Sequence, residues 1–530
     1  MRGIGANEAA VLTNNRDSVK IMWARVCKGL TAIFCGQVVI TASNLLLVPL
    51  YLAHWSPAVY GEWLVMSSLV SYLSTLDLGM NMAVVNKLTQ AYARGDLKAY
   101  ARFQHSAMAF YSMLAVGGSL LLAIALWLSP IPIWFGVRET QPEEAAWVIW
   151  LLALQILWAM PAGLVSAVYR TTGDLAKSQW IGNVQRLMAL LVVAFVLLFG
   201  GGLKAVAFFQ LAPMIMVVVF VWGDVRRRFP VLTLGVSQAS LPVVRDLVVP
   251  GLFFLLIIMA NTITQQGAVL VVASALGGVT VAIFVTSRTL ANLIRQVVGS
   301  LNVALWPDLT GMEARREQAQ LRSVHRLLMV GSTTLCIAVA AALWYEGGEI
   351  IAVWTRGKLE PDRTLLRLLL VQLVLQSPWL ASSVFTAAAN RHERLSWSYL
   401  ISAVLGLGTA ALLVGWMGTW AVPVGLIVGE ALACYHFVVK DTCRMVGESY
   451  GPFAGRLWVG VASVATMALM AGWGAHETIP GHFLVRWMAV GASTSAVSLA
   501  VAWGFWLTGE DRTVLLSRLR PLATSVGGEA

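Results

Sequence analysis

Hydrophobic runs of about 20 residues recur along the whole chain, and they restrict its fold more than any other feature. A helix of that length spans the roughly 30 Å hydrocarbon core of a bilayer. Of the 530 residues, 58% are hydrophobic and only 12% are charged, against about 25% charged residues in typical soluble domains. A single soluble core could not absorb this much apolar sequence. The sequence therefore predicts an all-α polytopic membrane protein.

We expect about fourteen transmembrane helices, arranged as two six-helix lobes of parallel orientation and two extra C-terminal helices. The expected organisation is a cytoplasmic N-terminal segment (1–28), an N-lobe with spans 1–6 (29–222), a cytoplasmic linker (223–248), a C-lobe with spans 7–12 (249–439), spans 13 and 14 (440–507) and a cytoplasmic tail (508–530).

Basic residues set the expected orientation. Most of the 37 Lys and Arg residues lie in alternate short loops, and by the positive-inside rule these loops and both termini face the cytoplasm. The net charge of +11 thus comes from loops that orient the protein in the membrane, and we expect no nucleic-acid partner. The loops on the other side are too short for an extracytoplasmic domain. We expect a multi-pass membrane protein with both termini in the cytoplasm.

The two expected lobes resemble each other at an offset of about 221 residues early in the lobe and about 217 later. Asn81 aligns with Asn302, and the mid-span Pro161 aligns with Pro378. Repeats of equal orientation are related by an axis along the membrane normal, with the substrate path between them. Each proline either bends a helix at a cavity or gate or forms a simple packing kink.

Polar residues recur at helical spacing in both lobes, where they indicate either a shared cavity or ordinary hydrogen bonding between helices. Span 1 offers Asn44, and span 7 offers Gln265. The spacing predicts one helix face for each of two further stripes. These are Ser67, Ser71, Ser74 and Asn81 in span 2, and Arg288, Asn292, Arg295 and Asn302 in span 8.

The two arginines of span 8 are the sharper signal. A guanidinium at the bilayer centre costs roughly 2.5–3.5 kcal/mol on insertion scales, so two on one face indicate a function. Their fixed donor forks suit phosphate oxygens. The alternative is an intramembrane salt bridge with Asp77 or Glu430. Arg186, near the start of span 5, either contributes to the same site or extends to the cytoplasmic surface.

Two carboxyl groups are candidates for ion coupling. Glu430 lies in the middle of span 12, where desolvation favours its neutral form and allows proton uptake and release. A hydrogen bond between helices is the other interpretation. Asp77, in the inner third of span 2, is a weaker case of the same kind. The sequence contains no metal-ligand motif, P-loop or nucleophile elbow, so we expect neither enzymatic activity nor a cofactor.

Three segments resemble the Wzx-type polysaccharide and O-antigen flippases of the multidrug/oligosaccharidyl-lipid/polysaccharide superfamily. They are the "YGEW" of 60–63, the "LDLGM" of 76–80 and the "ARGD" of 93–96. The resemblance implies transfer of a polyprenyl-pyrophosphate-linked oligosaccharide from the inner to the outer leaflet of the bacterial inner membrane by alternating access, with Arg288 and Arg295 supplying a cationic cavity. It also implies a role in lipopolysaccharide, capsule or exopolysaccharide synthesis, beside a polysaccharide polymerase and a chain-length regulator.

Other functions stay open at this point. Within transport, the chain could export a peptidoglycan precursor or drugs. Drug-exporting relatives often carry an acidic residue in the first span, where this chain has Gln37 and Asn44, which counts against a cationic drug. Outside transport, a membrane glycosyltransferase, polymerase or ligase would need a larger outer loop with catalytic groups. A non-transporting scaffold of a polysaccharide assembly complex is the remaining alternative.

Overall fold

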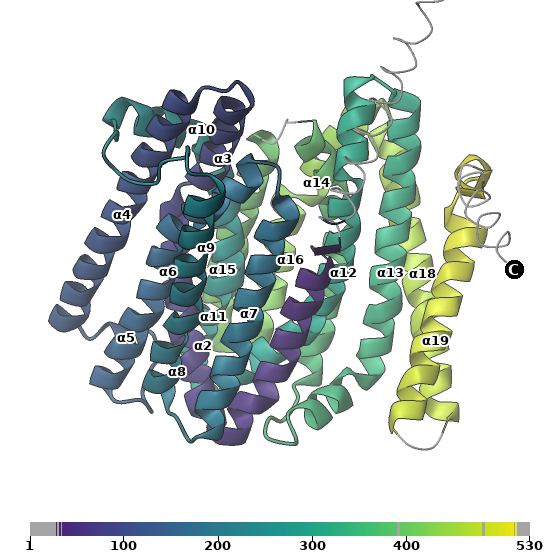
Figure 1. Ribbon diagram of the computed structural model, residues 1–530. Helices are drawn as coiled ribbons and strands as arrows, with labels where there is room; N and C mark the ends of the chain where they lie inside the picture. Colours follow the sequence, from purple (N-terminus) through teal and green to yellow (C-terminus); the bar gives the residue numbers. More distant parts are fainter. Residues whose placement is uncertain are drawn as a thin grey trace, which may run out of the picture. The chain divides into compact units, whose positions relative to one another are not determined.

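A computed structural model describes residue 28, residues 31–32, 34–389, 393–479, 483–513 and 515–516 (Figure 1). Every regular element in these residues is helical. Eleven helical stretches are long and apolar enough to cross a membrane, which confirms the predicted all-α polytopic membrane fold. The expected segment 1–28 lies outside the described residues except for Lys28, and so does most of the tail 508–530.

The chain divides into two compact units at three boundaries. The first follows Ser56, directly before α2 (Pro57–Ser71), the second follows Ser68 inside α2, and the third follows Leu255 inside α10 (Leu241–Thr262). The first unit also contains the helix Phe34–His54, η1 (Tyr72–Asp77), α3 (Met80–Ala93), α4 (Leu97–Leu128), α5 (Ile131–Trp134), α6 (Pro142–Thr171), α7 (Leu175–Leu198), α8 (Leu203–Phe209) and α9 (Leu211–Arg228).

The second unit contains the first twelve residues of α2, the end of α10 and the helices that follow it. These are η2 (Ile263–Gly267), α11 (Ala268–Leu276), α12 (Gly278–Ala314), α13 (Gln318–Trp354), α14 (Arg363–Ala388), α15 (Glu393–Met417), η3 (Gly418–Trp420), α16 (Ala421–Ala433), α17 (Tyr435–Val446), α18 (Tyr450–Thr478), α19 (Phe483–Val501) and η4 (Ala502–Trp506).

The eleven stretches account for twelve of the fourteen expected spans. One of them, Glu393–Val446, turns back at Gly418, where the backbone has a φ of +59°, and therefore holds two expected spans. Expected spans 2 and 8 correspond to α2 with α3 and to α12, whose polar residues lower their hydropathy.

Each unit has its own apolar core. In the first unit, side chains of α3, α4, α6, α9 and α10 meet around the fully buried Tyr100, Tyr111 and Tyr169. In the second, α13, α14, α17 and α18 pack with η4 around Phe385 and Trp506. Aspartate side chains cap the N-termini of α4 and α14. Asp96 accepts a hydrogen bond from the amide of Ala99, and Asp362 accepts one from the amide of Leu365, each over 2.9 Å.

The polar stripe predicted for span 2 is wrong, because this span is not one continuous helix. After α2 the chain forms a 3-10 turn (η1), in which Ser74 Oγ donates to the carbonyl of Ser71 over 2.7 Å. Leu78 and Gly79 then adopt left-handed conformations before α3 begins. The change of pitch and the break remove the common face on which Ser67, Ser71, Ser74 and Asn81 were expected.

The repeat-related prolines lie inside continuous helices, as the sequence indicated. Pro161 is within α6 and Pro378 within α14. Pro378 has no N–H for the carbonyl of Val374, and Ser377 Oγ donates to that carbonyl instead, over 2.9 Å. The neighbouring hydroxyl therefore satisfies the acceptor that the proline leaves free.

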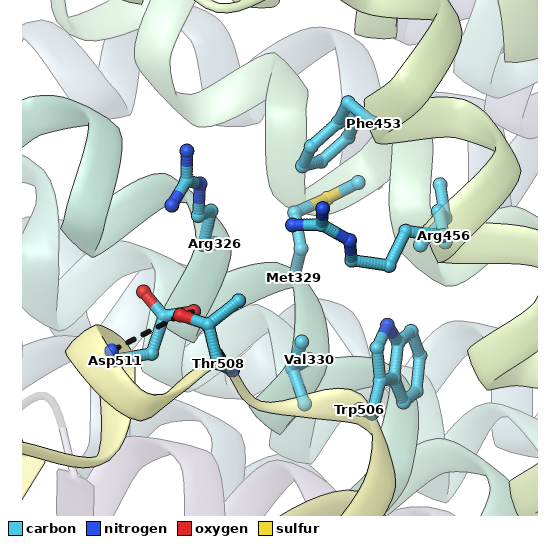
Figure 2. A pocket seen from close by; sticks show the side chains of 9 residues that line it. Arg326, Met329, Val330, Phe453, Arg456, Trp506, Thr508 and Asp511 are labelled. Carbon is cyan, nitrogen blue, oxygen red and sulfur yellow. Dashed lines mark hydrogen bonds between the residues drawn. The ribbon is translucent and has the colours of Figure 1, made fainter.

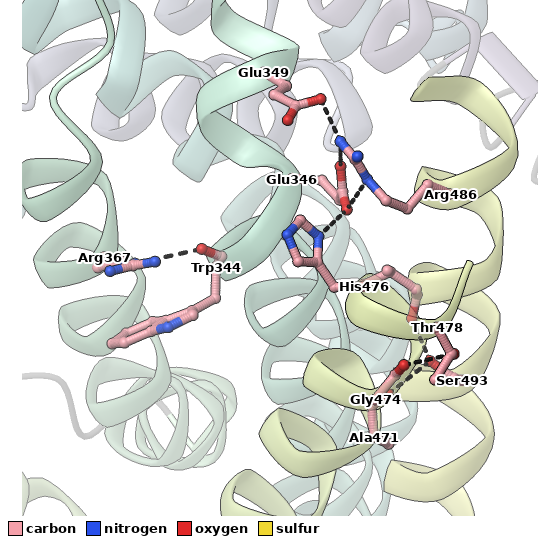
Figure 3. Close-up of polar contacts among 11 residues, drawn as sticks. Trp344, Glu346, Glu349, Arg367, Ala471, Gly474, His476, Thr478, Arg486 and Ser493 are labelled. Carbon is pink, nitrogen blue, oxygen red and sulfur yellow. Dashed lines mark hydrogen bonds and ion pairs between the residues drawn. The ribbon is translucent and has the colours of Figure 1, made fainter. Parts of the chain in front are cut away.

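A cluster of charged residues joins α13 to α18 and α19 (Figure 3). Glu346 is completely buried, and both its oxygens accept from Arg486, over 3.0 and 3.2 Å. His476 Nδ1 lies 2.7 Å from Glu346 Oε1, and Arg486 also pairs with Glu349. The two C-terminal helices α18 and α19 are thus attached to α13 by a buried ion pair as well as by apolar packing.

Candidate functional site

A cavity in the second unit contains both arginines of the span-8 stripe. Its open space is about 390 Å³, the mouth included. It is enclosed by α11, α12, α14, α16 and the π-helical turn η2. The lining residues are Thr264, Gln265, Ala268, Phe284, Arg288, Ala291, Asn292, Arg295, Leu369, Gln372, Leu373, Val422 and Leu426.

The helical spacing of α12 explains why its polar side chains meet in this cavity. Arg288, Asn292 and Arg295 follow each other at steps of four and three residues, which places them on one face. Arg288 is ten residues from the start of α12, about 15 Å along its axis. Arg288 and Arg295 thus both lie well inside this helix, away from its ends. The side chain of Asn302, the fourth residue of the stripe, lies outside the described part of the structure.

The backbone opposite Arg288 is irregular. Residues Ile263–Gly267 form a π-helical turn between α10 and α11, a feature that occurs often at functional sites. Arg288 Nη1 donates to the carbonyl of Gln265 over 2.6 Å, and its guanidinium lies 5.0 Å from the ring centre of Phe284. These two contacts orient the guanidinium without neutralising its charge.

Neither arginine has an ionic partner in the described part of the chain. No ion pair among the described residues includes Arg288 or Arg295, so the predicted alternative of a salt bridge to Glu430 is wrong for this structure. Two guanidiniums with no counter-ion in a cavity favour the binding of an anion from outside the protein.

Glu430 lies behind the cavity wall, held by neutral groups. It is 3% exposed, and its Oε1 accepts from Gln372 and Gln376 over 2.7 and 2.8 Å. Its Oε2 accepts from Trp379 Nε1 and Tyr435 Oη over 3.4 and 3.3 Å. Four donors from neutral side chains therefore satisfy this buried carboxyl group.

Gln372 connects the two features, because it lines the cavity and also donates to Glu430. The cavity and the buried carboxyl group are therefore joined by one hydrogen-bonded side chain, that of Gln372.

The remaining predicted site residues belong to the first unit and do not line this cavity. Asn44 and Arg186 are exposed, and Arg186 donates to Asn183 over 3.2 Å. Ser71 lies at the end of α2, where its carbonyl accepts from Ser74. Asp77 accepts a hydrogen bond from the hydroxyl of Tyr111.

Sequence reasoning missed the polar residues around Glu430. These residues are Gln372, Gln376, Trp379 and Tyr435. The spacing of Gln372, Gln376 and Trp379, at steps of four and three, is a signal that could have placed all three on one face of α14. Among the described residues, no group of His, Cys, Asp and Glu is arranged to hold a metal ion.

Comparison with known proteins gives the fold but no family. No family model and no curated protein matches the sequence. The lipid II flippase MurJ in an inward closed conformation matches with a TM-score of 0.69 at 10% identity, over 89% of this chain and 98% of that one. An inward-facing multidrug resistance MATE transporter of the MOP superfamily matches with a TM-score of 0.62 at 15% identity, over 77% and 99%.

An outward-facing MATE transporter also matches, with a TM-score of 0.57 at 15% identity, over 79% of this chain and 96% of that one. At such identities the likeness concerns the fold alone. The chain therefore has the multi-pass architecture of MATE transporters and of MurJ, and these neighbours are transporters and flippases rather than members of a catalytic family.

Proposed function

We propose that this protein is a flippase that moves a polyprenyl-pyrophosphate-linked oligosaccharide across the bacterial inner membrane by alternating access. The observation that carries the proposal is the pair of arginines without counter-ions, Arg288 and Arg295, in one membrane-depth cavity of a transporter fold. In this proposal both termini face the cytoplasm, and the glycan serves O-antigen, capsule or exopolysaccharide synthesis.

The pyrophosphate is assigned to the arginine cavity on charge. Holding two guanidiniums at the bilayer centre costs about 5–7 kcal/mol on insertion scales, and an anionic ligand would offset much of that cost. Asn292 and the side chain of Gln265 line the same cavity and would donate to the remaining phosphate oxygens. In the first unit, Asn44, Ser71 and Arg186 are proposed to contact the sugar or the substrate's second charge.

Energy coupling is proposed to act through Glu430, with Asp77 as a further candidate. An anion bound in the cavity would place a second negative charge beside Gln372, which donates to Glu430, and would so favour protonation of the carboxylate. Binding of substrate and uptake of a proton would then be linked. Surrounding membrane lipids and, in the cell, a polymerase and a chain-length regulator are the expected partners.

A second candidate is favoured by the structural likeness to MurJ and MATE transporters. A peptidoglycan precursor carries the same kind of lipid pyrophosphate and would suit the same arginines. Export of a cationic drug fits less well, because the cavity lining has two guanidiniums and no carboxylate, and Glu430, which Gln372 links to it, is already held by four donors.

Reconstitution tests the proposal. The full-length protein in proteoliposomes should translocate a fluorescent polyprenyl-pyrophosphate oligosaccharide, while the Arg288→Ala, Arg295→Ala double variant should not, and the corresponding lysine variant should retain part of the activity. Lipid II and a cationic dye serve as competing substrates. Transport of the dye alone, or full activity of the double alanine variant, would refute the proposal.

A further inference from the structure

A second cavity of the second unit lies away from the arginine cavity and shares no lining residue with it. It has about 350 Å³ of open space, its mouth included, and lies between α13, α18 and the chain that follows η4 (Figure 2). The lining residues are Arg326, Met329, Val330, Phe453, Arg456, Leu457, Trp506, Thr508 and Asp511.

Two guanidiniums reach this cavity, and they differ in charge balance. Arg326 Nε pairs with Glu448 Oε1 over 2.6 Å, and its side chain is 23% exposed. Arg456 is exposed and forms no ion pair or hydrogen bond with any described residue. The cavity therefore presents one neutralised and one free cation, both directed into the same space (Figure 2).

A carboxylate lies on another wall. Asp511 is 4% exposed, and its Oδ2 accepts from the amide and the hydroxyl of Thr508, over 3.3 and 2.6 Å. The amide of Asp511 donates in return to Thr508 Oγ1 over 3.2 Å, so the pair forms a capping box that fixes the carboxylate in place. Asp511 forms no ion pair with Arg326 or Arg456 in the described chain, so opposite charges stay apart across the cavity.

The rest of the wall is largely apolar, and its indole is closely packed. Met329, Phe453 and Trp506 are among the apolar groups that line it. Trp506 is 5% exposed and lies so close to Gly460 that a Cβ there would come within 2.3 Å of the indole. The ring is thus held flat against α18, at the end of a π-helical turn.

The helix lengths place the cavity at the level of lipid headgroups. The 29 residues of α18 span about 43 Å, some 13 Å more than a hydrocarbon core. Arg456, six residues from the start of α18, is therefore near the boundary between headgroups and acyl chains. The same end of the unit carries Arg322, Arg394 and Arg444, and basic pockets between helices at such an end bind phospholipid headgroups.

We propose that this cavity binds a phosphatidylethanolamine molecule of the surrounding membrane. Arg456 and Arg326 hold the phosphodiester, Asp511 accepts from the ammonium group, and the glycerol and first acyl carbons lie against Trp506 and Phe453. Separate positive and negative groups complement a zwitterion. Phosphatidylglycerol has no cation for Asp511, and the quaternary ammonium of phosphatidylcholine has no N–H to donate.

Native mass spectrometry of the full-length protein tests this inference, after exchange into micelles with phosphatidylethanolamine, phosphatidylglycerol or phosphatidylcholine of identical acyl chains. The wild type should retain phosphatidylethanolamine best. Arg456→Gln should lower its retention roughly tenfold, the value of one charge-assisted contact. Asp511→Asn, which keeps an acceptor for Thr508, should abolish the preference over phosphatidylglycerol without abolishing binding.

Arg444→Gln is the matched control, because Arg444 is exposed at the same end and lies 3.9 Å from Asp441, outside the cavity. It should leave retention of all three lipids unchanged. Equal retention of the three lipids by the wild type would overturn the assignment. So would a preference for phosphatidylethanolamine that survives both the Arg456 and the Asp511 substitution. Thermal unfolding of each variant shows that the comparison is made on folded protein.

Discussion

Removal of the Arg486 guanidinium should destabilise the protein more than any other single loss of charge at the end of the second unit where α13 meets α18 and α19. The Arg486→Gln change leaves the carboxylate of Glu346, which is completely buried, with His476 as its remaining partner. Breaking a buried ion pair by removing one member costs about 3–5 kcal/mol. Because His476 stays 2.7 Å away, we expect a value near 3 kcal/mol.

The assay measures unfolding of the purified protein in mixed micelles. Denaturing detergent is added stepwise, and the loss of helix content is recorded by circular dichroism. Arg394→Gln is the control, because Arg394 pairs with Asp441 over 3.1 Å with its side chain 78% exposed. Such surface pairs contribute about 0–1 kcal/mol. Adding Glu346→Gln to Arg486→Gln should recover part of the loss, since an amide is cheaper to bury than a charge.

A loss below about 1 kcal/mol for Arg486→Gln, equal to that of the Arg394 control, would refute this reasoning. It would mean that the cluster in Figure 3 opens to water in the membrane-embedded protein. A double variant less stable than Arg486→Gln alone would also contradict it, because the penalty would then not arise from the unpaired carboxylate.

Two further predictions concern the second unit. Glu430→Gln replaces an acceptor of four hydrogen bonds by an amide that must turn an N–H toward a donor, so the free energy of unfolding should fall by about 1–3 kcal/mol. Transport driven by a proton gradient should also weaken. Unchanged dependence of transport on the gradient would exclude a coupling role. Gly61→Val should lower the melting temperature sharply, because a Cβ at Gly61 would lie 1.8 Å from the carbonyl oxygen of Gly278. The control is Gly117→Ala, because a Cβ at Gly117 would have no neighbour within 4 Å. This control should leave the melting temperature unchanged or raise it.

Hydropathy and helical periodicity predicted the parts of this fold that depend on local sequence. Apolar runs long enough to span a bilayer form helices because unsatisfied backbone groups are too costly in lipid. The periodicity also placed Arg288, Asn292 and Arg295 on one face of α12, and all three line one cavity. The alignment of the two halves of the chain predicted that Pro161 and Pro378 lie at matching positions inside helices, and both do.

The break in span 2 could not be read from periodicity, because Ser67, Ser71 and Ser74 keep helical spacing across it. It arises from short-range bonding of Ser74 and Thr75 to the preceding turn and from the left-handed Leu78 and Gly79. The hydrogen bonds around Glu430 depend on which helices pack together, and one sequence does not contain that information. The π-helical turn beside Arg288 is hidden for the same reason.

The central claim is that Arg288 and Arg295 bind a lipid-linked pyrophosphate, and affinity is its most direct measure. Microscale thermophoresis of the purified protein with short-chain polyprenyl pyrophosphate, monophosphate and free alcohol should give affinities in that order. Each arginine should contribute roughly ten- to a hundredfold. The double alanine variant should therefore lose all preference for the pyrophosphate, while Arg367→Ala, outside the cavity, keeps it. An unchanged preference in the double variant would contradict the account.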